Sequence, residues 1–221
     1  EAIGEDVLAL LPDRGARVLV PGCGNAPFQL HMYDAGFTSM VCGDLSPVVI
    51  RQLQEAHAGS DRQIQYEVLD ATDMSYDDGS FDVVVDKSLL DCLRCCPSGT
   101  FVVERYLNEV FRVLSPDGKF VLASCHPEPS LKADLRGRSW KMAHVETYAY
   151  GEDGDDAAQP VSDEFSITLC LVQKVESSDA GADVVAGTAQ ERKKARRKAE
   201  KNRTRAHRRD MDELDVQPLR P

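Results

Sequence analysis

The segment that most constrains the fold is an apolar, strand-like run at residues 17–21, which ends in two glycines one residue apart. Gly22 and Gly24 have no side chains, so the backbone of this turn can approach a ligand closely. No Gly-Lys-Ser/Thr follows, as a phosphate-binding loop requires. The third glycine of the dinucleotide fingerprint would fall at Pro27, which argues against a pyrophosphate. The turn therefore indicates a ligand without phosphate, unless it is only a tight connection between a strand and a helix.

Strand-like and helix-like segments alternate along the chain. Apolar runs rich in β-branched residues predict parallel strands at residues 16–22, 38–44, 63–70, 81–87 and 119–125. Helical patterns occupy residues 27–36, 46–59, 100–118 and about 130–135. Two last strands, separated by an acidic loop, predict an antiparallel pair at residues 140–150 and 165–175. The fold class is therefore α/β and Rossmann-like: a mostly parallel sheet with a C-terminal antiparallel hairpin, helices on both faces, and a ligand crevice at the carboxyl ends of the strands.

Composition divides the chain into a domain at residues 1–175, a flexible linker at 176–190 and a basic tail at 191–221. Through residue 175 there are 14 basic and 28 acidic residues, whereas the remainder has 12 basic and 9 acidic residues. An acidic domain disfavours broad nucleic-acid binding and suits a basic substrate, although acidity also serves solubility. The tail has no apolar stripe. We expect it to be a solvated or disordered extension, or else a ribosome or RNA anchor or a nuclear address.

The cysteine pattern bears on compartment and metals. The number of cysteines, seven, is odd, and most lie in strand-like runs, which indicates reduced thiols in a cytoplasmic or nuclear protein. Cys92, Cys95 and Cys96 form a C-x-x-C-C cluster, but no second pair has zinc-ligand spacing, so we expect no metal. No apolar run reaches the roughly 20 residues of a membrane span, and the start does not resemble a secretory signal, so we expect no membrane partner. Because the chain begins without methionine, we expect a trimmed fragment.

Acidic residues lie at the ends of three of the predicted strands. Asp44 ends the second strand, where a carboxylate can accept hydrogen bonds from both ribose hydroxyls of an adenosine, or can cap the next helix. Asp70 and Ala71 end the third strand and are placed to read an adenine edge, or to form a simple turn. Asp86 and Lys87 end the fourth strand and face the middle of the crevice, unless they are only a surface ion pair. Together these positions indicate an adenosine joined to an amino acid without pyrophosphate, which describes S-adenosylmethionine.

Four longer segments resemble the class I, seven-strand S-adenosylmethionine-dependent methyltransferases: VLVPGCGNAPFQLHMYDAGF, CGDLSPVVI, VLDATDMSYDDGSFDVVVDKSLLDCL and EVFRVLSPDGKFVLAS. More narrowly, they resemble the methyltransferase-like group that includes lysine methyltransferases of elongation factor 1-alpha and of citrate synthase. The resemblance covers residues 16–175. The chain departs from the group's G-C-G-N-S and D-K-G-T-L-D-A-L motifs at Ala26, Ser88, Leu89 and Cys92. The group's aromatic-rich segment upstream of the first strand is not found.

The resemblance implies a seven-strand methyltransferase fold and a role for each strand-end position. By this resemblance, the methionine part of the cofactor would lie at Gly22, Cys23, Gly24 and Asn25, and the ribose at Asp44 and Leu45. The adenine would lie at Asp70 and Ala71, and the sulfonium end at Asp86 and Lys87. Asp86 or Asp91 would position the target amine.

The implied activity is methylation of a lysine side chain in a protein such as a translation elongation factor, with S-adenosylmethionine as the cofactor and S-adenosylhomocysteine as its product. Two alternatives remain open. One is a small-molecule or RNA methyltransferase, with the basic tail as the RNA anchor. The other is a cofactor-binding module without activity. The motif Asn/Asp-Pro-Pro-Tyr/Phe does not follow the fourth strand, which argues against adenine or glutamine-amide methylation of the kind that this motif performs.

Overall fold

The computed structural model describes residues 2–11, 13–149 and 166–175. The chain divides into two units, Glu1–Ser178 and Asp179–Pro221, and the described residues all belong to the first. The predicted linker and basic tail, together with the acidic loop before the last strand, lie outside the described residues. None of the described helices is long and apolar enough to cross a membrane.

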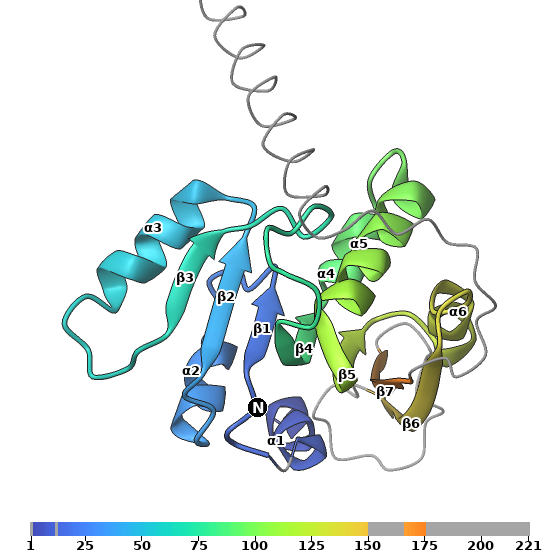
Figure 1. Ribbon diagram of the computed structural model, residues 1–221, viewed down its shortest axis with the longest axis horizontal. Helices are drawn as coiled ribbons and strands as arrows, with labels where there is room; N and C mark the ends of the chain where they lie inside the picture. The colour runs from blue at the N-terminus through green and yellow to red at the C-terminus, as the bar shows by residue number, and fades with distance from the viewer. Residues whose placement is uncertain (1, 12, 150–165, 176–221) are drawn as a thin grey trace, which may run out of the picture. The chain divides into compact units, whose positions relative to one another are not determined.

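The described strands form one seven-stranded sheet with the order β3-β2-β1-β4-β5-β7-β6 (Figure 1). The first five strands run parallel, and β7 lies antiparallel between β5 and β6. This confirms the predicted mostly parallel sheet and its antiparallel end. The strands are β1 (Val18–Pro21), β2 (Met40–Asp44), β3 (Gln65–Val68), β4 (Phe81–Lys87), β5 (Leu114–Ser124), β6 (Trp140–Ala149) and β7 (Ser166–Lys174).

Helices pack on both faces of the sheet, as the sequence predicted. Side chains alternate between the faces along each strand, so β1 contributes Leu19 to one apolar cluster and Val18 and Val20 to the other. The first cluster contains side chains of α4 (Leu89–Arg94), α5 (Gly99–Val113) and α6 (Glu128–Asp134). The second contains side chains of α1 (Ala2–Leu10), α2 (Phe28–Asp34) and α3 (Pro47–Ala56). Because both faces are covered, the central strands β1 and β4 are near-continuous apolar runs.

Three helices and one strand differ from the sequence expectation. The helix predicted for residues 100–118 ends at Val113, and β5 begins at once with Leu114, which is extended, fully buried and paired with Phe81. Pro116 cannot continue a helix, and Asp117 takes a positive φ of 60°, so the segment turns within the strand. The structure also adds α1 and α4, neither of which was predicted. Both are short, and α4 has no side-chain cap at its own N-cap position.

Candidate active site

The glycine turn after β1 is tied to β2 and is open on one side. Cys23 is buried, and its N–H donates to the carbonyl of Gly43 at 2.9 Å. Gly22 and Gly24 have φ values of 62° and 57°, a region that side chains rarely adopt. A Cβ added to Gly22 would lie 2.8 Å from the Leu89 side chain, whereas one added to Gly24 would meet nothing within 4 Å. Gly22 is therefore needed for packing, and Gly24 borders open space where a ligand can reach the backbone.

Asp44, at the end of β2, holds this turn. Its carboxylate accepts hydrogen bonds from Gly24 N at 3.0 Å and from Ser46 N at 2.9 Å. The carboxylate is half-buried, so part of it remains accessible. Beside it, the side chains of Leu45 and Val68 are 67% and 55% exposed, and Val68 pairs with Asp44 in the sheet register. A carboxylate next to exposed apolar side chains suits a sugar carrying a flat base. Sequence reasoning missed Val68, because nothing in its strand distinguishes an exposed valine from a core one.

The segment after β3 begins with Asp70, whose carboxylate is engaged locally. Its Oδ1 accepts from the N–H and the hydroxyl of Thr72, at 2.9 and 2.8 Å. Ala71 is buried in the core beneath it. Leu69 N donates to the carbonyl of Asp44 at 2.9 Å, so the ends of β2 and β3 are joined by the backbone. The role of this turn in binding adenine stays a prediction. The hydrogen bonds that Asp70 accepts from Thr72 are those of a turn residue, which was the alternative.

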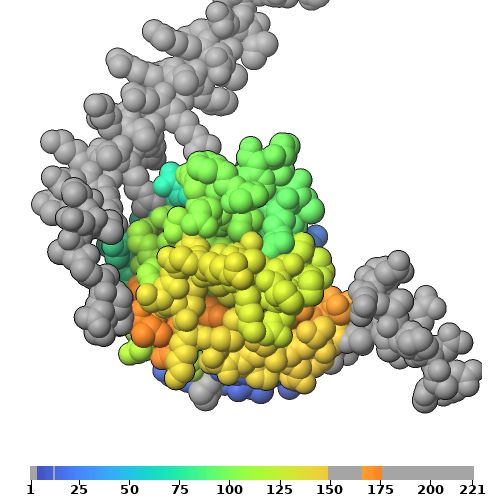
Figure 2. Space-filling view, turned by 90° about the vertical axis from the view of Figure 1, so that its right-hand side faces the viewer, coloured from blue at the N-terminus to red at the C-terminus, as the bar shows by residue number. Residues whose placement is uncertain are grey.

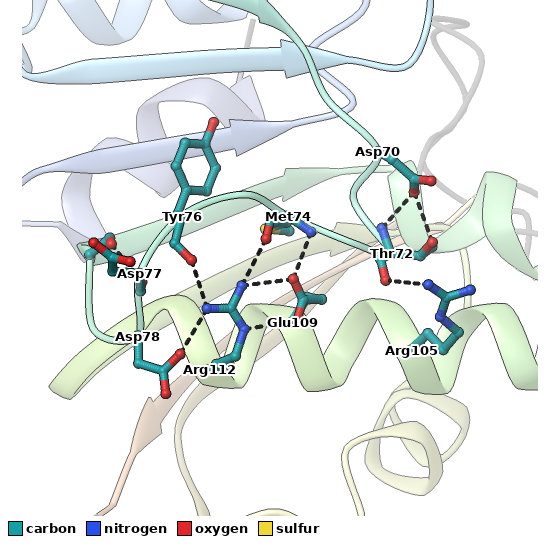
Figure 3. Close-up of polar contacts among 10 residues, drawn as sticks. Asp70, Thr72, Met74, Tyr76, Asp77, Asp78, Arg105, Glu109 and Arg112 are labelled. Atoms are coloured by element: carbon teal, nitrogen blue, oxygen red, sulfur yellow. Dashed lines mark hydrogen bonds and ion pairs between the residues drawn. The ribbon is translucent and has the colours of Figure 1, made fainter. Parts of the chain in front are cut away.

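An arginine of α5 fixes the rest of this segment (Figure 3). Arg112 donates to the carbonyls of Met74 and Tyr76, at 3.0 and 2.8 Å, and forms ion pairs with Asp78 and Glu109. The Glu109 carboxylate also accepts from Met74 N at 2.6 Å. Its hydrogen bond to Arg112, aided by Asp78, raises the pKa of the guanidinium further above its usual range. These contacts hold residues 74–78 against α5 and so fix the position of the edge of the candidate site. They give these residues a structural role, not a role in the reaction.

Asp86, near the end of β4, is fully buried. Its carboxylate accepts from Leu89 N at 2.7 Å, from Leu90 N at 3.1 Å and from the Tyr106 hydroxyl at 2.8 Å. Burial raises the pKa of this carboxyl to about 7, against hydrogen bonds that lower it. With no exposed surface, Asp86 is not placed to position a substrate amine or to contact the cofactor with its side chain, and those predicted roles do not fit. Its oxygens cap α4 instead, which explains why that helix needs no cap of its own.

Asp91 lies on α4 and links it to the segment after β5. Its carboxylate accepts from the Ser124 hydroxyl, from Cys125 N at 3.1 Å and from His126 Nδ1 at 2.9 Å. Burial alone would raise the pKa of this carboxyl, but the hydrogen bonds and the nearby imidazole lower it below its usual range. Its role in positioning an amine stays a prediction. Sequence reasoning passed over Cys125 and His126, although a Cys-His pair at the carboxyl end of a strand is a recognisable signal.

The structure brings together only some of the predicted residues. Gly24 and Asp44 are in direct contact, whereas Asn25 and Lys87 are exposed beside the turn and after β4. A cavity of about 690 Å³ lies next to His126, among side chains of α4, α5 and the end of α6, and none of the predicted cofactor residues lines it. Figure 2 views the molecule from the side of α5, α6 and β6.

Comparison with known families supports one assignment. Residues 19–122 match the family model described as a methyltransferase domain. The human eEF1A lysine and N-terminal methyltransferase is 34% identical over 158 residues, which cover 69% of this chain and 22% of that protein. The mouse EEF1A lysine methyltransferase 4 is 32% identical over 147 residues, covering 61% of this chain and 56% of that protein. The chain thus spans little more than half of one such relative, and about a quarter or less of several others.

Solved structures agree on the fold. An S-adenosylmethionine dependent methyltransferase from Mesorhizobium loti superposes with a TM-score of 0.58 at 19% identity, covering 76% of this chain and 96% of that one. A Burkholderia thailandensis 1,6-didemethyltoxoflavin-N1-methyltransferase, solved with S-adenosylhomocysteine, gives a TM-score of 0.59 at 16% identity, covering 79% and 77%. Likeness at this identity concerns the fold alone.

Proposed function

We propose that the chain is an S-adenosylmethionine-dependent methyltransferase, which transfers a methyl group from that cofactor to a lysine side chain of a protein; the match of residues 19–122 to a methyltransferase domain supports this proposal. The observation that supports cofactor binding is the pair formed by Gly24, which borders open space, and Asp44, whose carboxylate is partly accessible. The observation that supports a lysine acceptor is the likeness to relatives named as eEF1A lysine methyltransferases. Elongation factor 1A is therefore the substrate to test first.

The residues present fit S-adenosylmethionine. The methionine part would lie at the glycine turn, where Gly24 leaves room beside the backbone. The ribose would lie at the Asp44 carboxylate, and the base against the exposed side chains of Leu45 and Val68. When bound, the cofactor supplies an electrophilic methyl group on a sulfonium. The protein's part is to orient the two reactants and to exclude water.

The acceptor amine must lose its proton before it can attack, because a lysine has a pKa of about 10.4 in water. Desolvation lowers this pKa, and an acidic domain favours the approach of a basic segment. The Asp91 side chain is largely buried, with 12% of it exposed, and is ionised, and it lies on the helix that follows β4. We infer that it influences the acceptor side of the site, whereas the buried Asp86 supports the fold beneath.

The sequence also supports a second, separate proposal for the tail. Eleven lysines and arginines between residues 191 and 209 suit an electrostatic contact with ribosomal RNA, near which a translation factor acts. A cytoplasmic or nuclear location would be consistent with that contact. Removing residues 176–221 should reduce ribosome association and its salt dependence while leaving cofactor affinity unchanged. Equal association of both proteins with ribosomes at low salt would contradict the anchor.

Methyl transfer can be tested with a radiolabelled methyl donor. The chain is incubated with purified elongation factor 1A and, in parallel, with cell lysate, and the Asp44→Ala variant serves as the inactive control. We expect label in protein, removed by protease and not by ribonuclease, and mapped to a lysine. Label removed by ribonuclease would favour the RNA methyltransferase alternative. Cofactor binding without any transfer would favour the non-enzymatic module.

A further inference from the structure

We propose that Asp91, Cys125 and His126 form a binding site for a divalent transition-metal ion, of which zinc is the best match. The three side chains come from α4 and from the segment directly after β5. One ligand atom from each, a carboxylate oxygen, a thiol sulfur and an imidazole nitrogen, lies within 4.8 Å of the others. This set combines the three ligand types that zinc takes in proteins.

Two of the three distances between ligand atoms are close to those of neighbouring ligands around one ion. His126 Nδ1 lies 3.6 Å from Cys125 Sγ and 2.9 Å from Asp91 Oδ1. Tetrahedral zinc, with bonds of about 2.3 Å to sulfur and about 2.0 Å to nitrogen, separates those two ligand atoms by roughly 3.5 Å. The sulfur and nitrogen are therefore already at coordination spacing. The oxygen and nitrogen need to part by only a few tenths of an ångström.

The carboxylate is held by further donors, as ligating carboxylates are in metal sites. The fully buried Ser124 donates its hydroxyl to Asp91 Oδ1, and Cys125 N donates to Asp91 Oδ2 at 3.1 Å. These two bonds fix the orientation of the carboxylate relative to the segment after β5, which carries the other two ligands. Such an arrangement reduces the ordering needed when an ion binds.

The site is open to solvent. Cys125 is exposed, and His126 lines the cavity of about 690 Å³ described above. A water molecule can complete the coordination. Binding would release the thiol proton of Cys125 to solvent. His126 would bind through Nδ1 as the neutral imidazole that carries its proton on Nε2, so the Nδ1 proton that it donates to Asp91 would also have to leave Nδ1 for solvent. No electron transfer is involved.

A bound ion would clamp α4 to the segment after β5, on the side of the sheet where β4 and β5 end. The alternative is that these groups form only the hydrogen bond between Asp91 and His126, with no affinity for an ion. The two cases differ in metal binding, which can be measured without any methyl transfer. The test therefore does not depend on the proposed function.

The experiment uses the whole chain, stripped with a chelator and titrated with Zn²⁺ or Co²⁺ under reducing conditions. We expect about one ion per chain and a near-ultraviolet band from a thiolate bound to Co²⁺. Cys125→Ser and His126→Gln should each lose at least about tenfold in affinity, and Cys125→Ser should also lose the band. Ser124→Ala, which keeps all three ligands, should lose about tenfold. Cys96→Ser, which replaces another exposed cysteine, just after α4, is the matched control and should bind as the wild type does.

Unchanged metal affinity in Cys125→Ser and His126→Gln would overturn the proposal, as would the absence of binding by the wild type. Loss of binding in Cys96→Ser but not in Cys125→Ser would place the ion at the other cysteines instead and overturn it equally. Thermal unfolding of each stripped variant checks that the fold is retained. If a ligand variant does not fold, Ser124→Ala and the cobalt band of the wild type decide the question.

Discussion

Asp44 and Asp86 occupy similar places in one sheet, at the ends of β2 and β4 on either side of β1, yet their surroundings are opposite. Asp44 is half-buried and accepts from the backbone of a turn that borders open space. Asp86 is fully buried and accepts from two backbone N–H groups and a tyrosine hydroxyl. An acid at a strand end can therefore serve a ligand or serve the fold, and its exposure distinguishes the two.

These two roles differ in how loss of the carboxylate affects the free energy of unfolding and the affinity for a ligand. A buried acceptor that satisfies several donors contributes mainly by preventing those donors from being left unpaired, at about 1–3 kcal/mol each. A partly exposed acceptor can be replaced by water, so its loss affects stability little and ligand binding much. Each prediction below tests whether this division holds, from the largest expected effect to the smallest.

Replacing Asp86 with alanine should lower the free energy of unfolding by about 4 kcal/mol, because Leu89 N, Leu90 N and the Tyr106 hydroxyl lose their acceptor. Asp44→Ala is the control and should lose no more than about 1 kcal/mol, because water can reach its donors. Urea denaturation at pH 7 measures both. Similar losses in the two variants would remove the distinction between the two acids.

Asp86→Asn should change the pH dependence of stability. Burial places the native pKa of Asp86 at about 7, above the usual 3.8, so the folded state favours the protonated form. The stability due to this group is therefore fully present below about pH 4 and is lost as the pH rises through about 7. Between pH 4 and pH 7 the wild type should lose about 3 kcal/mol relative to Asp86→Asn, whose amide does not titrate. Parallel stability curves for the two proteins would show that this carboxyl is ionised throughout.

Substitutions of the two glycines in the turn after β1 should also differ in their effect on stability. Gly22→Ala combines a left-handed backbone with a Cβ that lies 2.8 Å from Leu89, and should cost about 2 kcal/mol of stability. Gly24→Ala has the backbone strain without the contact, and should cost about 1 kcal/mol. Chemical denaturation of the two variants gives the comparison directly. A larger loss for Gly24→Ala would mean that the space beside it is filled in solution.

Much of the fold was predictable, because it follows from local patterns. Apolar runs rich in β-branched residues predicted the parallel strands, and Ser46 with Pro47 predicted the start of α3, where the Ser46 hydroxyl accepts from Val49 N. The helix over residues 100–118 was overextended, because amphipathic spacing continued up to the strand residue Leu114. The helix α4 was missed, because its cap comes from Asp86 rather than from a residue at its start.

The site was less predictable than the fold. Spacing along the chain placed Asp44 and Asp86 at strand ends correctly, but it carries no information about which strand end is covered. The cover over Asp86 comes from Tyr106, twenty residues further along the chain, on the apolar face of α5. Likewise, Asp91 meets Ser124, Cys125 and His126 only because β4 and β5 are neighbours in the sheet. Contacts of this kind depend on tertiary packing and are not visible in a single sequence.

The division between the two acids is tested most directly by calorimetric titration of S-adenosylmethionine into the wild type, Asp44→Ala and Asp86→Asn. Asp44→Ala should bind at least about a hundredfold more weakly, since charge-assisted hydrogen bonds to ribose are worth about 3 kcal/mol together. Asp86→Asn, which keeps the shape of a buried side chain, should bind within about threefold of the wild type. Unchanged affinity in Asp44→Ala, or an equal loss in Asp86→Asn, would contradict the assignment of one acid to the cofactor and the other to the fold.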